Sequence, residues 1–169
     1  MKSLQNTDST FFAPMNPSFN KDVLKLDMNG IVKLALIDKP VSIFKSFKLS
    51  EEKTIDVIML MLIQFQDFYN CKSKMQRPQL EETAYLIVQN FRHLNYYDIG
   101  VCLKQAKLNT KVYDRIDGGM ILELLTRYDI DRTGMIVTER EKQKAQQNAE
   151  WSSLGERSSE ISIKDLLKS

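Results

Sequence analysis

The sequence predicts an all-α protein: a compact bundle of about five or six helices with a polar C-terminal helix and flexible ends. Glycine (6) and proline (4) are scarce in the 169 residues, whereas an all-β fold needs many tight turns. The hydrophobic fraction of 43% and the charged fraction of 27% are typical of a folded globular domain. We expect an N-terminal arm (1–20), a helical domain (21–132), a polar helical extension (133–150) and a flexible tail (151–169).

The first fifty residues have the least decisive pattern. Residues 1–20 are polar, and we expect them to form an irregular arm whose phenylalanines anchor it to the domain. These anchors are Phe11, Phe12 and Phe19. Between residues 21 and 48 the apolar residues fit short helices and short strands about equally, so both remain open. Pro40 is a candidate for the first residue of a short helix.

Two strong helical patterns follow. Ser50 is a suitable N-cap for a helix over residues 51–70, which is apolar on nearly every face and is therefore expected at the centre of the bundle. After a polar loop, Pro78 suits the entry of the next helix. Its apolar residues repeat at helical spacing. They are Leu80, Ala84, Ile87, Val88 and Phe91.

Two more helices are predicted before residue 132. Asn95 and Asp98 are placed to cap a helix whose apolar face contains Ile99, Cys102, Leu103 and Ala106. Asp117 is the expected N-cap of a helix with a second apolar face. That face consists of Ile121, Leu124, Leu125 and Tyr128.

A separate polar helix is expected near the C-terminus. Gly134 interrupts the preceding pattern, and Thr138 with Glu141 matches a capping box that would open a charged helix over residues 140–150. The Ser-rich tail then ends in a short apolar patch, which we interpret as a docking peptide for a protein partner. The patch consists of Ile161, Ile163, Leu166 and Leu167.

Composition argues against several classes of function. The net charge of +2 gives no global attraction to nucleic acid or to an anionic membrane. Cys71, Cys102 and His93 do not have the spacing of a metal site or of a catalytic set, so we predict no metal, no cofactor and no enzymatic activity. The longest apolar run is far shorter than the roughly 20 residues that span a bilayer, and no secretory signal is evident. A cytoplasmic location is expected.

One stretch resembles an EF-hand calcium loop. Asp129, Asp131 and Thr133 would supply oxygen ligands at the first, third and fifth loop positions, and Gly134 would supply the sharp turn. Arg140 occupies the last loop position, where a bidentate glutamate is required. The alternative interpretation is a plain helix–turn–helix junction.

Basic residues gather at two connectors. The first contains Lys72, Lys74 and Arg77, and the second is flanked by Lys104, Lys107, Lys111 and Arg115. If both connectors lie at the same end of the bundle, these side chains form a surface able to neutralise several phosphates. The alternative is that they are ordinary solvated loop residues and helix C-terminal cations.

A resemblance to a known family is found in two segments, "FRHLNYYDIGVCLKQAK" (91–107) and "VYDRIDGGMILELLTRYDIDR" (112–132). Together with the helix before them, from residue 79, they resemble a family of small uncharacterised helical proteins from phages and mobile elements of gut bacteria. The matching positions are Leu94, Asp98, Ile99, Cys102, Tyr113, Asp114, Arg115, Asp117, Gly118, Tyr128 and Arg132. The resemblance implies a helical fold and a mobile-element origin, and no established activity.

These observations favour a non-enzymatic accessory or adaptor protein of a phage or mobile element. We expect it to act in DNA replication through protein–protein contact, as a helicase loader does, with a replicative helicase as the partner; this is an analogy of size and helical pattern. The first alternative is a virion structural or packaged protein, which would place the chain in the virion. The others are a degenerate calcium binder and a direct DNA binder. The oligomeric state is left open.

Overall fold

Helices account for the secondary structure of the described part of the chain. The computed structural model describes residues 16–109 and 115–166, with side chains as far as Trp151 except that of Pro17. The helices are α2 (Pro17–Lys25), α3 (Met28–Lys33), α4 (Ile43–Leu49), α5 (Glu51–Phe68), α6 (Arg77–Asn90), α7 (Tyr96–Asn109) and α8 (Gly118–Leu166), with a π-helical turn η2 (Leu34–Asp38) after α3. The predicted all-α fold is confirmed, with more helices than the expected five or six.

Residues 17–49 are mostly helical. The sequence left helix and strand open for residues 21–48, and the irregular arm expected over residues 1–20 is wrong from Pro17 onward, because α2 begins there. Each short helix starts at a polar side chain that accepts a backbone N–H: Asn16 from Ser18 (3.0 Å) and Asp27 from Gly30 (2.7 Å). Ser42 caps α4 in the same way, so Pro40 lies before that helix and does not open it as expected. The predicted Phe19 anchor is buried on α2, whereas Phe11 and Phe12 lie outside the described residues.

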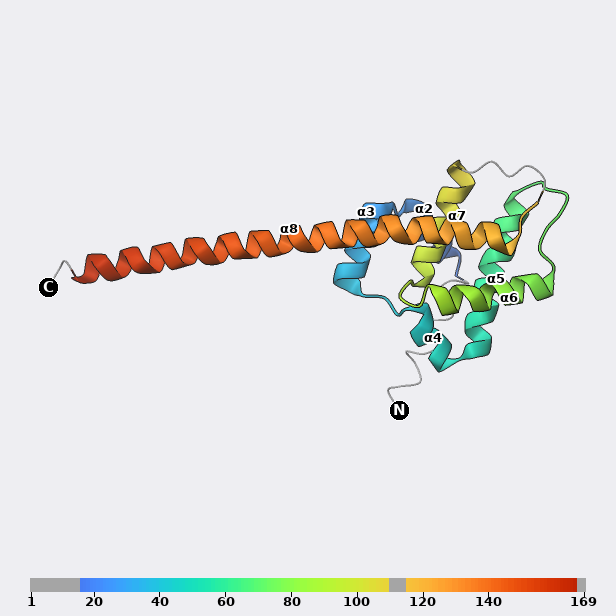
Figure 1. Ribbon diagram of the computed structural model, residues 1–169, viewed down its shortest axis with the longest axis horizontal. Helices are drawn as coiled ribbons and strands as arrows, with labels where there is room; N and C mark the ends of the chain where they lie inside the picture. Colours follow the sequence, from blue (N-terminus) through green and yellow to red (C-terminus); the bar gives the residue numbers. More distant parts are fainter. Residues whose placement is uncertain (1–15, 110–114, 167–169) are drawn as a thin grey trace. The chain divides into compact units, whose positions relative to one another are not determined.

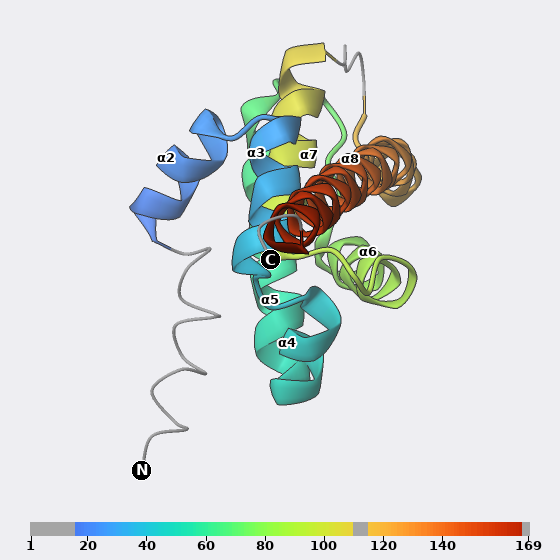
Figure 2. The same cartoon turned by 90° about the vertical axis from the view of Figure 1, so that its left-hand side faces the viewer.

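The central position predicted for the helix after Ser50 is confirmed. Ser50 accepts the backbone N–H of Lys53 (3.4 Å), and α5 packs against α4, α6 and α7. Ile58 and Leu62 on α5 are fully buried. Figures 1 and 2 show α5 and α7 running steeply across α6 and the first turns of α8.

The predicted start of α7 is also confirmed. The Asn95 side chain accepts the backbone N–H groups of Tyr97 (2.8 Å) and Asp98 (3.2 Å), and Asp98 in turn accepts the N–H of Asn95 (2.9 Å). This is a reciprocal cap with an aspartate in the place of the usual glutamate. The apolar residues predicted for α6 and α7 are buried.

A glycine lets the start of α8 approach α6 closely. The Asp117 side chain caps α8 by accepting the N–H of Met120 (3.0 Å), as predicted. A Cβ atom on Gly118 would lie 2.4 Å from the Thr83 hydroxyl oxygen, so only glycine fits there without a shift. Ile121, Leu125 and Tyr128 then enter the core.

The predicted break at Gly134 is wrong, because α8 continues through it to Leu166. A single glycine costs a helix about 1 kcal/mol relative to alanine, which lowers helix stability without ending the helix. The Thr138 hydroxyl donates to the Gly134 carbonyl (3.0 Å), one turn back, so Thr138 is an interior residue and not an N-cap. The calcium-loop interpretation fails for the same reason, since residues 129–140 are helical.

The chain divides into two units, residues 1–132 and 133–169. The first contains the bundle core. The described residues of the second, as far as Leu166, are the rest of α8, so the segment expected as a flexible tail has a helical backbone from residue 151 to Leu166.

Candidate functional site

The two basic connectors meet at one end of the bundle. The chain after α5 forms an isolated bridge with the chain before α8, in which the Ile116 N–H donates to the Ser73 carbonyl (3.1 Å). Gln66 fixes the first connector: its side chain accepts the Met75 N–H (3.1 Å) and donates to the Met75 carbonyl (3.4 Å). The convergence that a phosphate-binding surface requires is therefore present for this pair of connectors.

Several of the cations at this end already have partners. Lys74 pairs with Asp67 (2.9 Å), and Arg115 pairs with Asp117 (2.9 Å). These pairs are largely exposed, so each contributes little to stability, but each brings a carboxylate into the basic surface. Lys72 and Arg77 are exposed, and Lys111 lies outside the described residues. The carboxylates of Asp67 and Asp117 therefore lower the net positive charge of the predicted basic patch.

Lys104 and Lys107 of α7 contact α2 and α5. The Lys104 ammonium donates to the carbonyl of Leu24 (3.4 Å) and to that of Leu26, at the C-terminal end of α2. Cations are favourable at this end of a helix because the unpaired carbonyls concentrate negative charge there. The Lys107 ammonium lies 5.1 Å from the Phe68 ring centroid and 6.0 Å from that of Phe65. Both side chains line a pocket between α2, α5 and α7.

A buried ion pair connects the first turn of α7 to α8. The Asp98 carboxylate, which is fully buried, accepts hydrogen bonds from the Arg132 guanidinium (2.6 Å) and the Tyr128 hydroxyl (3.0 Å). Burial and the negative charge of Asp98 raise the pKa of Tyr128, so this hydroxyl remains a donor. Asp98, Tyr128 and Arg132 all belong to the resemblance motif, and in the structure they form one packing and hydrogen-bonding unit.

The histidine and the cysteine considered for catalysis have different surroundings. His93 contacts Asp129 (2.6 Å between Nε2 and Oδ1), and this pair also links the α6–α7 turn to α8. Cys102 is buried, and burial, followed by the negative charge of Asp98, raises its thiol pKa to about 12. The thiol is therefore protonated at neutral pH and is not a nucleophile.

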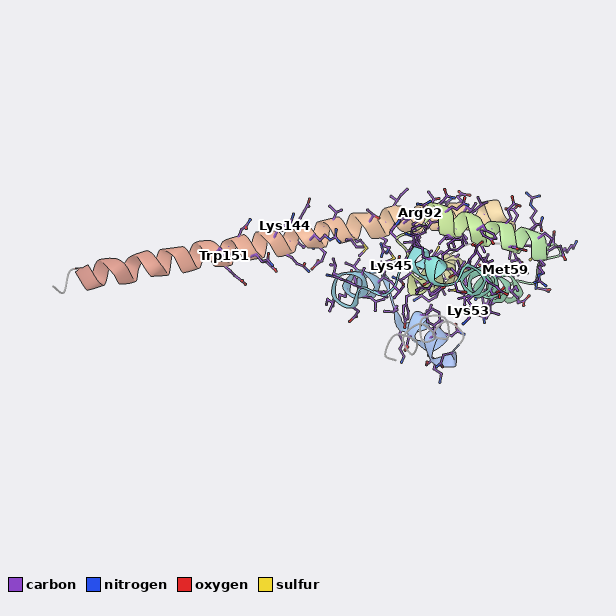
Figure 3. The ribbon with its side chains drawn as sticks, turned by 90° about the horizontal axis from the view of Figure 1, so that it is seen from below. Lys45, Lys53, Met59, Arg92, Lys144 and Trp151 are labelled. Atoms are coloured by element: carbon purple, nitrogen blue, oxygen red, sulfur yellow. The ribbon has the colours of Figure 1, made fainter. Side chains whose placement is uncertain are left out.

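The second unit contains the most exposed helical surface. Every residue from 140 to 151 is exposed, and the Trp151 side chain is 76% exposed. Figure 3 shows the Lys144 and Trp151 side chains standing out from α8. The side chains of Ile161, Ile163 and Leu166, and all of Leu167, lie outside the described residues, although the backbone at the first three is part of α8.

Two features were missed in the sequence. The pocket between α2, α5 and α7 could not be predicted, because the sequence pattern did not distinguish α2 from a strand. Trp151 was assigned to a polar tail, although it is the only tryptophan and follows a helical segment without an apolar face, which is a signal for a contact residue.

Comparisons with known proteins identify no relative: no family model, no curated protein and no solved structure matches the chain. Among the described residues, no group of three His, Cys, Asp or Glu side chains is placed to hold a metal ion. None of the helices in that part of the chain has the length and apolar character needed to cross a bilayer.

Proposed function

We propose that this chain is a non-enzymatic adaptor that presents the second half of α8 to a protein partner. The observation that carries the proposal is the exposure of all residues from 140 to 151, with Trp151 at 76%. A tryptophan side chain left in water is unfavourable, and tryptophan is enriched among the residues that dominate binding at protein interfaces.

Helix energetics support the same proposal. A short helix in water is marginal by itself, because most helix stability in proteins comes from packing an apolar face. Residues 140–151 have no such packing, so a partner groove that receives Trp151 would supply it. The apolar residues expected to dock, Ile161, Ile163, Leu166 and Leu167, follow within the same segment and would extend the contact.

The size and helical pattern, which are similar to those of helicase loaders, suggest the kind of partner. We propose a component of mobile-element DNA replication, with a replicative helicase as the first protein to test. The partner assignment rests on the analogy with helicase loaders, whereas the contact surface rests on the exposed helix. A result can therefore refute the helicase as the partner without refuting the contact through α8, and the reverse.

An affinity pull-down from the native host tests the contact. The full chain, a Trp151→Ala variant and a chain lacking residues 151–169 are compared, with Leu49→Ala as a control for an exposed apolar residue (56% exposed) on α4. We expect the wild type and Leu49→Ala to retain the same replication protein and the other two to lose it. Equal retention by all four would refute the α8 contact, and recovery of capsid or tail proteins would favour the virion alternative.

Direct nucleic-acid binding is a second candidate, because the Ser73–Arg115 bridge joins the two basic connectors. Binding through this end should weaken steeply with salt, since counterions are released from the phosphates. Replacing Lys72 by alanine should reduce the slope of log affinity against log salt by about one. Absent or salt-insensitive binding removes this candidate.

A further inference from the structure

The largely apolar pocket between α2, α5 and α7 has a volume of about 220 Å³. Its apolar wall is formed by five buried side chains, Phe19, Val23, Met61, Phe65 and Leu103, and exposed residues of α2 and α5 lie at its rim. Figure 2 shows α2 beside the column formed by α5 and α7. An apolar cavity of about 150 Å³ in another protein is large enough to bind benzene, so this pocket has room for a longer hydrocarbon group.

The close approach of α2 to α7 depends on Gly100. A Cβ atom at this position would lie 2.9 Å and 3.1 Å from the two methyl carbons of Val23. The Phe19 and Tyr97 rings, 4.8 Å apart between centroids, hold the same two helices together. The pocket is therefore formed by packed elements of the bundle and does not depend on an exposed loop.

Two lysine ammonium groups lie at the pocket. Lys104 and Lys107 are three residues apart on α7 and both line it. Lys104 uses two of its three N–H groups on the carbonyls of Leu24 and Leu26, which leaves one. Among the described residues, neither lysine forms an ion pair with a carboxylate.

The ammonium group of Lys107 is partly buried and has no carboxylate partner among the described residues. Burial lowers the pKa of its ammonium, and its contacts are the faces of Phe65 and Phe68. An anionic group beside it would compensate for the lost hydration, whereas a cationic group would be repelled. The pocket thus combines an apolar interior with a requirement for negative charge at its edge.

We infer that this pocket binds a small amphipathic carboxylate, of the class of medium-chain fatty acids. The hydrocarbon chain lies against Val23, Met61, Phe65 and Leu103, and the carboxylate accepts hydrogen bonds from Lys104 and Lys107. This inference is independent of the proposed α8 contact, because all the residues involved belong to α2, α5 and α7. Failure of the pull-down and failure of the binding experiment below are separate results.

Titration of the full chain with sodium octanoate, octanol and octylammonium tests the inference, with NMR shifts of the Val23 and Leu103 methyl groups locating the ligand. We expect octanoate to bind more tightly than octanol and octylammonium to bind least. From hexanoate to octanoate the affinity should rise about fourfold per methylene group until the pocket is full. The three eight-carbon probes are compared on the wild-type protein, so this part of the test needs no variant.

A variant pair identifies the charged contact. Lys107→Met keeps an apolar side chain beside the rings and removes the charge, and we expect it to lose about tenfold in octanoate affinity with little change for octanol. Lys72→Met removes an exposed charge outside the pocket and should leave both affinities unchanged. Equal affinity for the three probes, shifts elsewhere in the protein, or no binding at all would overturn the inference. A short peptide with phenylalanine beside aspartate serves as a further probe. If the pocket bound this peptide and none of the three eight-carbon probes, its ligand would be a protein partner, and the inference would be overturned.

Discussion

Helix α5 and residues 140–151 of α8 are both helical, but their surroundings differ. Along α5 the buried residues recur from Thr54 to Gln66, and three other helices cover it. From residue 140 to Trp151 every side chain of α8 is exposed. The first helix is stabilised by the packing of its side chains, and the second has only its own backbone hydrogen bonds and local side-chain pairs.

The packed bundle therefore determines the stability of the protein, whereas the exposed part of α8 is proposed to determine binding. Substitutions in the bundle should lower the free energy of unfolding, because they remove packing or leave a buried charge alone. Substitutions between residues 140 and 151 should leave that free energy nearly unchanged and alter binding instead.

The largest effect is expected for Asp98→Asn. Removing this charge leaves the buried Arg132 guanidinium without its counter-ion, which typically costs about 3–5 kcal/mol. Urea denaturation followed by circular dichroism measures the loss. Asp67→Asn, which breaks the exposed pair with Lys74, is the matched control and should cost less than about 1 kcal/mol. Equal losses for the two variants would contradict the structural role given to Asp98.

A core truncation should cost slightly less. Leu62→Ala removes a fully buried side chain of α5, and comparable truncations cost about 2–5 kcal/mol. Ile130→Ala, at a position that is 67% exposed, should stay within about 0.5 kcal/mol of the wild type. The same denaturation experiment compares them, and a large effect at Ile130 would show that this face of α8 is covered in solution.

The smallest effect concerns pH and Cys102. Because burial raises its thiol pKa from 9.0 to about 12, the folded protein holds this proton more tightly than the unfolded chain. Cys102 therefore contributes stability that is complete below about pH 9 and is lost as pH rises toward 12, with on the order of 1 kcal/mol lost by pH 10. Unfolding free energies at pH 8 and pH 10 should fall less for Cys102→Ala than for the wild type. An identical fall in both proteins would mean that the thiol is not buried as described.

The sequence was informative where apolar periodicity and a capping residue agreed. Ser50, the Asn95–Asp98 cap and Asp117 each mark the start of a helix correctly, and the apolar stripes behind them are buried. Before residue 50 the helices are too short for their periodicity to be distinguished from that of strands. At Gly134 the pattern indicated a break, but a single glycine was not enough to end the helix.

Little of the candidate site could be predicted, for physical reasons. The Asp98–Arg132 pair joins residues that are 34 positions apart, and no local pattern encodes such a pairing. Lys104 and Lys107 look like ordinary helix C-terminal cations until α2 is placed beside them. The convergence of the basic connectors likewise depends on a single long-range bridge between Ser73 and Arg115.

Amide hydrogen exchange of the purified full chain compares the stability of the two helical segments. We expect amides in the middle of α5 to exchange only on global unfolding, with protection close to the full stability of about 5–15 kcal/mol. Amides between residues 140 and 151 should exchange through local opening, with protection of about 0–2 kcal/mol. Equal and strong protection of both segments would contradict the account, because the second half of α8 would then already be covered and not available to a partner.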